Sequence, residues 1–249
     1  MTSISRTDLI SPAWSARIVP RGRSRHKGGL FIPMSSLVLA LLGCLTGCGY
    51  AGPPAGPPNV SPQAANVVSL DPQNWYIFYS AGMPPHPSTD TAGAWSFEFP
   101  NAEMGGHVNY VQTPFNATTT PHSVTITFRV ESRAPQYEVL DPGDHLPATV
   151  RLFIEQHGDN LSDPNGRWWA GASIYNLGSQ DGQTITFTVP FTSDQWGNVD
   201  GQFDAQAFSA ALKNIGWVGM TFGGQSFAGH GVALSSGSAK YILIDYRVD

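Results

Sequence analysis

A predicted β-hairpin of residues 150–156 and 168–174 carries the side chains best suited to chemistry. Side chains two residues apart on an extended chain share a face. If these consecutive strands pair, one face of the hairpin collects Arg151, Phe153, Glu155, Trp169, Gly171 and Ser173. An exposed tryptophan covers the apolar C–H side of a sugar ring, while Arg and Glu hydrogen-bond its hydroxyls. The pattern predicts such a ligand site around Trp169; the competing interpretation is that loops or the N-terminal segment cover Trp169 and Phe153, while Arg151 and Glu155 form an ion pair.

The segment 222–231 is a second candidate, because it holds four glycines together with Gln225 and His230. Glycine allows a ligand to approach the backbone closely. Gln225 and His230 are therefore predicted ligand contacts at the rim of the domain, and His230 is a candidate base. The alternative is a long hairpin loop that needs glycine for its geometry.

The segment 159–166 is rich in Asp and Asn oxygens, which are the ligands that calcium prefers. It lacks the spacing and terminal glutamate of an EF-hand loop. The same residue types are common in turns, and we favour that interpretation. A structural calcium ion is the alternative, and no other cofactor is predicted.

Common catalytic patterns are missing from the sequence. Its histidines show no HExxH spacing, and no Gly-x-Ser-x-Gly sequence occurs. Two carboxylates suffice for glycoside hydrolysis, but they pair in space, and nothing singles out two of the glutamates. The sequence therefore favours a binding protein and leaves a polysaccharide-active enzyme as the alternative.

Strict alternation of apolar and polar residues recurs from Val67 onward and is typical of half-buried antiparallel strands. Ten strands are predicted, near residues 74–79, 95–99, 107–112, 123–130, 150–156, 168–174, 184–191, 217–222, 229–234 and 242–248. In the last of them Ile242, Ile244, Tyr246 and Val248 are expected on one face. Four tryptophans with largely apolar neighbours are predicted to be core residues: Trp75, Trp95, Trp196 and Trp217.

One segment departs from this alternation. Asp204 is suited to cap a short helix with apolar residues at Phe208, Leu212 and Ile215, and Gly216 is suited to end it. Many strands with one short helix predict an all-β fold, an antiparallel two-sheet sandwich of jelly-roll type, over residues 67–249.

The N-terminal region has the features of an export signal. Five basic residues between positions 17 and 27 precede an apolar stretch of residues 30–45, which is short for a membrane-spanning helix. Leu45-Thr46-Gly47-Cys48 follows and resembles a bacterial lipobox, which implies removal of residues 1–47 and lipidation of Cys48. A poorer lipobox ends at Cys44, an uncleaved signal anchor is the alternative, and Met34 is a second candidate start site.

Removing residues 1–47 changes the charge of the chain. The leader holds six of the 13 Lys and Arg residues and one of the 18 Asp and Glu residues, so the remainder has a formal charge of −10. This balance argues against nucleic acid as a partner. Both cysteines, Cys44 and Cys48, precede the predicted domain, so it contains no disulfide. Residues 48–66 are rich in Pro and Gly and predict an extended tether rather than a proline-motif ligand.

Residues in the C-terminal half carry a second resemblance. The sequences Phe187–Pro190, Trp196–Gly201, Phe208–Leu212 and Val218–Phe222 resemble, in their order, the corresponding half of galactose-binding-like sandwiches, an architecture that several carbohydrate-binding module families use. The resemblance implies a glycan partner. We therefore expect an exported, lipid-anchored envelope protein that binds carbohydrate without catalysis and meets the membrane only through its anchor. A structural lipoprotein that binds another envelope protein is the other alternative, and the oligomeric state stays open.

Overall fold

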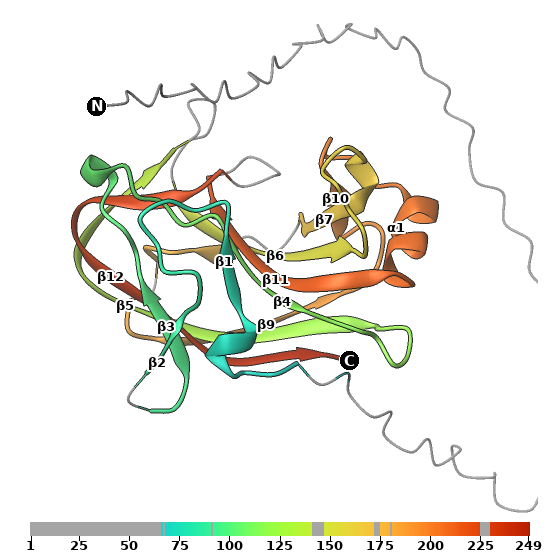
Figure 1. Cartoon of the computed structure of the whole chain (residues 1–249), viewed down its shortest axis with the longest axis horizontal. Helices are drawn as coiled ribbons and strands as arrows, with labels where there is room; N and C mark the ends of the chain where they lie inside the picture. Colours follow the sequence, from blue (N-terminus) through green and yellow to red (C-terminus); the bar gives the residue numbers. More distant parts are fainter. Residues whose placement is uncertain are drawn as a thin grey trace, which may run out of the picture. The chain divides into compact units, whose positions relative to one another are not determined.

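The computed structural model describes residues 66, 68–90, 92–140, 147–171, 175–179, 181–224 and 230–249 (Figure 1). All of these residues belong to one compact unit, Pro58–Asp249. The leader 1–47, Cys48, all of the tether except Asn66, and Gln225 lie outside the described residues. Their assignments therefore stay predictions.

The described chain forms twelve strands and one α-helix. The strands are β1 (Tyr76–Phe78), β2 (Ser88–Thr89), β3 (Trp95–Glu98), β4 (Tyr110–Pro114), β5 (Ser123–Val139), β6 (Thr149–Gln156), β7 (Arg167–Ala170), β8 (Tyr175–Asn176), β9 (Thr184–Pro190), β10 (Trp196–Asn198), β11 (Ile215–Gly223) and β12 (Val232–Val248). The helix is α1 (Ala205–Leu212), and three short 3-10 helices are η1 (Pro72–Asn74), η2 (Ala102–Met104) and η3 (Pro164–Gly166).

The strands form two antiparallel sheets. The seven-stranded sheet has the order β1-β4-β11-β6-β7-β10, with β8 beside β6, and the five-stranded sheet has the order β2-β3-β12-β5-β9. Figure 1 shows β6 and β11 in one layer and β5 and β12 in the other. This architecture confirms the predicted all-β jelly-roll sandwich with one short helix.

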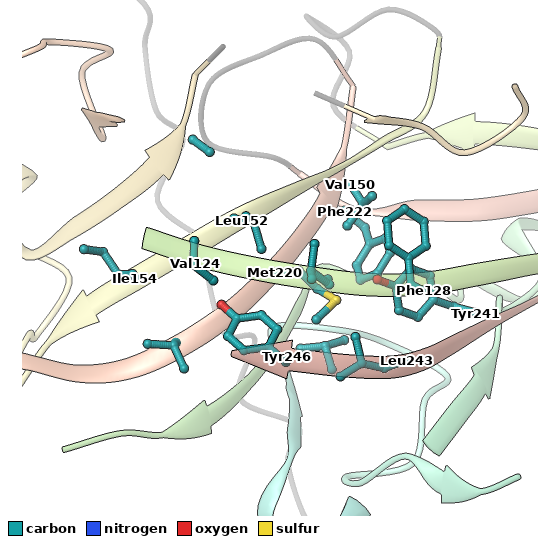
Figure 2. Packing of buried hydrophobic residues seen from close by; sticks show 14 of the residues in the cluster. Val124, Phe128, Val150, Leu152, Ile154, Met220, Phe222, Tyr241, Leu243 and Tyr246 are labelled. Atoms are coloured by element: carbon teal, nitrogen blue, oxygen red, sulfur yellow. The ribbon is translucent and has the colours of Figure 1, made fainter. Parts of the chain in front are cut away.

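The alternating residues build the core between the sheets. In β5 the side chains of Val124, Ile126, Phe128 and Val130 are at most 3% exposed, as the alternation predicts. Figure 2 shows side chains from both sheets packed together in this layer: Val150, Leu152, Ile154, Met220 and Phe222 from one sheet, and Val124, Phe128, Tyr241, Leu243 and Tyr246 from the other. Sheet-on-sheet packing buries the inward face of each strand, so the outward faces are covered or exposed according to other segments of the chain.

The C-terminal strand differs from its prediction in two respects. The two predicted strands 229–234 and 242–248 are parts of one strand, β12, which pairs with β5 along almost its whole length. The predicted common face of Ile242, Ile244, Tyr246 and Val248 is wrong. Tyr246 and Val248 belong to the core cluster, but Ile242 and Ile244 do not. A register shift between Leu243 and Asp245 is the cause, because one extra residue in a strand reverses the faces that follow it.

The helix also ends earlier than predicted. Asp204 caps it as expected, since its Oδ1 accepts hydrogen bonds from the amides of Gln206 and Ala207 at 2.9 Å each. Helix α1 stops at Leu212, and Ile215 and Gly216 already belong to β11. A Cβ on Gly216 would lie 2.8 Å from the His157 ring, so close packing against the end of β6, not helix capping, requires this glycine. No α-helix in the described part of the chain is long and apolar enough to cross a bilayer.

The chain enters the domain beside its last strand. The Asn66 amide donates a hydrogen bond to the Val248 carbonyl at 2.8 Å. The Asn66 side chain accepts hydrogen bonds from the Thr118 amide at 2.8 Å and the Thr118 hydroxyl at 2.9 Å. Two separate segments therefore hold the point of entry.

Candidate functional site

The predicted site residues lie on the face of the seven-stranded sheet that points away from the core, here called the outer face. Strand register places on it Tyr76, Phe78, Tyr110, Gln112, Arg151, Phe153, Glu155, Arg167, Trp169, Trp217, Gly219 and Thr221. The predicted pairing of the hairpin is confirmed, because Phe153 stands opposite Trp169 and Glu155 opposite Arg167. The alternation of residues along the two strands therefore predicted the correct face.

Gly219 lies at the centre of this face. A Cβ there would lie 2.3 Å from the Val111 carbonyl oxygen and 2.7 Å from Gln112 Cα, so β4 approaches β11 too closely for a side chain. From the opposite sheet, the Tyr246 hydroxyl crosses the core and donates a hydrogen bond to the Gly219 carbonyl at 3.2 Å. Gly219 is thus held by β4 within its own sheet and by Tyr246 from the opposite sheet.

The predicted exposure of Trp169 is wrong. Trp169 and Phe153 are both 0% exposed, and they form a small second cluster with Tyr110, against which Val199 packs. The Phe153 ring lies 5.3 Å from Trp169 and 5.1 Å from Tyr110. Alternation predicts which face a side chain points to, but it does not predict what covers that face. Whether a ligand reaches these residues stays a prediction.

The two charged residues of the predicted site occupy different surroundings. Arg151 is buried at 2% exposure and stands opposite Thr221. Glu155 is half-buried, stands opposite Trp217 on one side and Arg167 on the other, and shares a hydrogen bond with the Gln112 side chain. The charged and polar groups that act on Glu155 are Asp159, Arg167 and Gln112, whereas the ion-pair interpretation expects Arg151.

Arg167 is held by the loop that precedes it. Its Nε lies 3.0 Å from Asp159 Oδ2, and the Asp159 side chain is fully buried. The other oxygen of Asp159 accepts a hydrogen bond from the Leu161 amide at 3.1 Å. A Cβ on Gly166 would lie 2.3 Å from Asp159 Oδ1, so the glycine makes room for this carboxylate. The Arg167 guanidinium also lies 6.0 Å from the centre of the Trp169 ring, within cation–π range.

These neighbours change the ionisation of the outer face. Burial raises the pKa of Glu155 to about 7; the nearby Asp159 carboxylate also raises it, whereas Arg167 and a hydrogen bond from Gln112 lower it. Burial likewise raises the pKa of Tyr110 to about 12, although a hydrogen bond with Arg167 opposes the shift. Arg167 stands opposite Glu155 but forms its ion pair with Asp159, so the two carboxylates share one cation. We call Gln112, Glu155, Asp159 and Arg167 the polar cluster.

Beside the polar cluster lies a group of half-exposed and exposed aromatic side chains, the aromatic strip: Tyr76, Phe78, Tyr79 and Trp217. Tyr76 and Phe78 are stacked at 5.5 Å with 7° between their planes, and the Trp217 ring meets both edge-on, at 5.8 and 5.9 Å. Phe78 is 37% exposed and Tyr79 is 56% exposed. Apolar side chains that are exposed next to one another, rather than singly, are a feature of interaction surfaces.

Tyr79 has an unusual backbone. Its φ is 51°, in the left-handed region that bulky residues avoid. Its ring contacts the edge of Tyr110 at 5.4 Å. Partial burial and the charges of Glu155 and Asp159 raise the pKa of the Tyr79 hydroxyl, whereas Arg167 lowers it. An exposed ring is thus held next to the polar cluster at a cost in backbone energy, which is a pattern found at functional sites.

The sequence interpretation missed the aromatic strip. Trp217 was predicted in the core, yet it is half-exposed on the outer face, whereas Trp75, Trp95 and Trp196 are fully buried as predicted. The sequence did contain a signal for it, namely the alternation of these aromatic residues with buried apolar ones. Trp217 alternates with buried Val218, just as Tyr76 and Phe78 flank buried Ile77. Apolar neighbours hid this signal, because two aromatics around an isoleucine resemble a strand buried on both faces.

Two further candidates are His230 and the loop 159–166, whose first residue, Asp159, belongs to the polar cluster. His230 is exposed next to the start of β12. In the loop 159–166, Asp163 and Asn160 accept hydrogen bonds from the amides two residues on, at 2.8 and 3.1 Å. Such Asx turns match the favoured turn interpretation. Within the described residues, no group of three or more His, Cys, Asp or Glu side chains is arranged to hold a metal ion. The calcium alternative stays a prediction.

A shallow hollow of about 330 Å³ lies on the five-stranded sheet, away from the outer face. Apolar side chains from Leu70, Ile242 and Ile244 line it, together with Asp90 and Arg129. Arg129 Nη2 already lies 2.7 Å from Glu131. This hollow therefore offers fewer uncommitted polar groups than the outer face.

No protein-family model matches this sequence, and no curated protein matches it as a relative. Solved structures share part of its architecture. A family 11 carbohydrate-binding module from Clostridium thermocellum, in complex with a β-1,3-1,4-mixed-linked tetrasaccharide, is 11% identical with a TM-score of 0.40, covering 74% of this chain and 94% of that chain. The xylan-binding module CBM15 is 12% identical with a TM-score of 0.33, covering 72% and 95%. At this distance the likeness assigns no role to any residue here.

Proposed function

We propose that this protein binds a glycan on the outer face of its seven-stranded sheet and does not cleave it. The observation that carries the proposal is the aromatic strip beside the polar cluster. Phe78 and Tyr79 offer exposed rings, and the half-buried Glu155 on β6 offers a hydrogen-bonding group opposite Trp217. Stacking on a ring covers the C–H side of a sugar, and the polar groups bond to its hydroxyls.

The charges favour a neutral glycan over an anionic one. The chain after residue 47 carries a formal charge of −10. Arg167, the basic residue nearest the aromatic strip in the polar cluster, is engaged by the buried Asp159 carboxylate at 3.0 Å. Glu155 adds further negative charge above pH 7. The overall negative charge of the chain therefore favours a neutral sugar over a uronic acid or a sulfated sugar.

The rest of the proposal concerns location. We infer export, removal of residues 1–47 and lipidation of Cys48, with residues 48–66 as the tether between membrane and sandwich. Mass spectrometry of the mature N-terminus tests this directly. A lipid-modified Cys48 at the N-terminus supports the anchor, and an unmodified or internal Cys48 rules it out.

Binding is tested on a polysaccharide array with wild-type protein, Phe78→Ala and Tyr79→Ala. Both side chains are exposed, so neither change opens a core cavity. Losing one stacking ring should weaken binding about 10- to 100-fold, by analogy with other exposed aromatic contacts. Met104→Ala is the matched control, because Met104 is 87% exposed on η2 and removes apolar surface elsewhere. Equal binding by all four proteins would remove the aromatic strip from consideration.

One observation favours a polysaccharide-cleaving enzyme as the second candidate. Glu155 has a pKa of about 7, while the neighbouring Asp159 is paired with Arg167. Such a raised pKa suits the general acid of glycoside hydrolysis, whereas the fully buried Asp159 is not available as the second carboxylate of the pair. Release of reducing sugar by the wild type and its loss in Glu155→Gln would support the enzyme. Binding without release supports the primary proposal.

A further inference from the structure

The four edges of the two sheets differ greatly in length. Strand β2 has two residues, β1 and β10 have three each, and β9 has seven. An edge strand presents unpaired N–H and C=O groups to any other extended chain. Short edges are one of the ways in which proteins prevent such pairing. Three of the four edges are protected in this way, and β9 is not.

β9 also lacks the other protective features. Its sequence, Thr-Ile-Thr-Phe-Thr-Val-Pro, contains no charged residue, and its only proline is the last position. Its register with β5 runs without interruption, whereas the pairing of β5 with β12 contains shifts. Among the described strands, β5 is the only one that pairs with β9. The edge is therefore long, regular and uncharged.

The residues of β9 make this edge self-complementary. Thr184, Thr186 and Thr188 are exposed on one face, while Ile185 and Phe187 are half-buried on the other. The sequence is nearly symmetric about Phe187. If two copies run antiparallel with Phe187 opposite its counterpart, Thr186 meets Thr188 of the second copy, and Ile185 meets Val189.

We propose that β9 pairs with β9 of a second copy of this chain, which joins the two five-stranded sheets into one continuous ten-stranded sheet. The partner is a second copy because the two faces match under a twofold axis, apolar against apolar and threonine against threonine. Charge agrees with this choice. Two copies of an acidic chain repel one another over most of their surface, and β9 is a stretch without charge.

The existing sheet shows the contact that the interface would repeat. The hydroxyls of Thr125 and Thr188 lie 2.8 Å apart across β5 and β9, and those of Thr127 and Thr186 lie 2.8 Å apart. A hydroxyl has one donor and two acceptor sites, so Thr186 and Thr188 can each accept a further bond. The threonine rows would thus continue across the twofold axis, supported by a main-chain ladder.

Sedimentation velocity of the full-length chain over a wide concentration series tests the proposal. The expected result is a monomer–dimer equilibrium. The test variant is Thr186→Lys/Thr188→Lys, which places lysine opposite lysine twice across the axis and should weaken dimerisation at least about tenfold. The control is Thr127→Lys, which breaks one of the two hydroxyl pairs and adds a positive charge one strand away from the edge; Thr125 is left unchanged because it is only 6% exposed. Circular dichroism confirms that both variants fold.

Sedimentation of the three proteins distinguishes pairing through β9 from other modes of association. Dimerisation that is lost in the β9 variant and kept in the β5 variant supports the interface. A wild type that stays monomeric at every concentration overturns it, as does association that survives in both variants or weakens equally in both. The lipid expected at Cys48 is the same in all three proteins, so association through an anchor cannot produce the difference.

Discussion

Replacing Glu155 with glutamine should make the protein more stable in alkali and leave its stability in acid unchanged. Burial raises the pKa of Glu155 from 4.5 to about 7. The folded protein therefore holds a proton on this carboxyl between pH 4.5 and 7 that the unfolded chain has already released. Stability must then fall as pH rises through this window, and the whole penalty is present above pH 7. Glutamine keeps the shape and stays neutral throughout.

The magnitude follows from the shift. A carboxyl moved this far, if fully buried, would lose at most about 3 kcal/mol. Glu155 is only half-buried, so solvent screening reduces the expected effect to roughly 1–2 kcal/mol. Glu155→Gln should thus gain about that much stability at pH 8 and about nothing near pH 4.5.

Urea denaturation of wild type and variant at several pH values between 4.5 and 8 measures this difference. Glu98→Gln is the control, because Glu98 is an exposed glutamate on the five-stranded sheet and reports the effect of removing a charge alone. A gain in Glu155→Gln that is the same at every pH would refute the reasoning. So would a variant that is less stable than wild type at pH 8.

Changes at three further residues test local features of the fold. Gly219→Ala should cost at least about 2 kcal/mol in thermal unfolding, because its Cβ would lie 2.3 Å from the Val111 carbonyl oxygen; an unchanged melting temperature would contradict the close approach of β4. Asp204→Ala should lose about 1 kcal/mol by removing the cap of α1, whereas Asp204→Asn should keep most of it in the same denaturation assay. Leu161→Gly should gain up to about 1 kcal/mol, since Leu161 is exposed with φ 68°; a loss of stability would show that its side chain packs in solution.

The elements of the sandwich follow from local rules that a single sequence contains. Alternation in β5 needs no knowledge of β12, because an apolar residue at every second position is enough to define a buried face. The cap at Asp204 is equally local. The bulge near Ile244 is not, since nothing in the surrounding residues marks an extra residue in the ladder. It becomes visible only once β12 is paired with β5.

The site was predictable only in part, for a similar reason. The alternation of residues predicted that Trp169 and Phe153 lie on the outer face. Their exposure, however, depends on residues distant in sequence, such as Val199. Trp217 shows the converse error. Its face could be read from Val218, but its exposure could not be inferred from the apolar residues around it. Exposure is a tertiary property, and it determines which aromatic residues are available to a ligand.

The hydrogen bonds of Asn66 have a practical consequence for binding experiments. Asn66 is bonded to Val248, and the Ser123 amide donates to the Asp249 carbonyl at 3.0 Å, so the point where the chain enters the domain adjoins its C-terminal residue. A surface label or biotin placed at Asp249 would hold the domain from nearly the same point as the predicted upstream tether. Immobilised protein would then present its outer face to a glycan in much the same orientation as protein held by its own N-terminal segment.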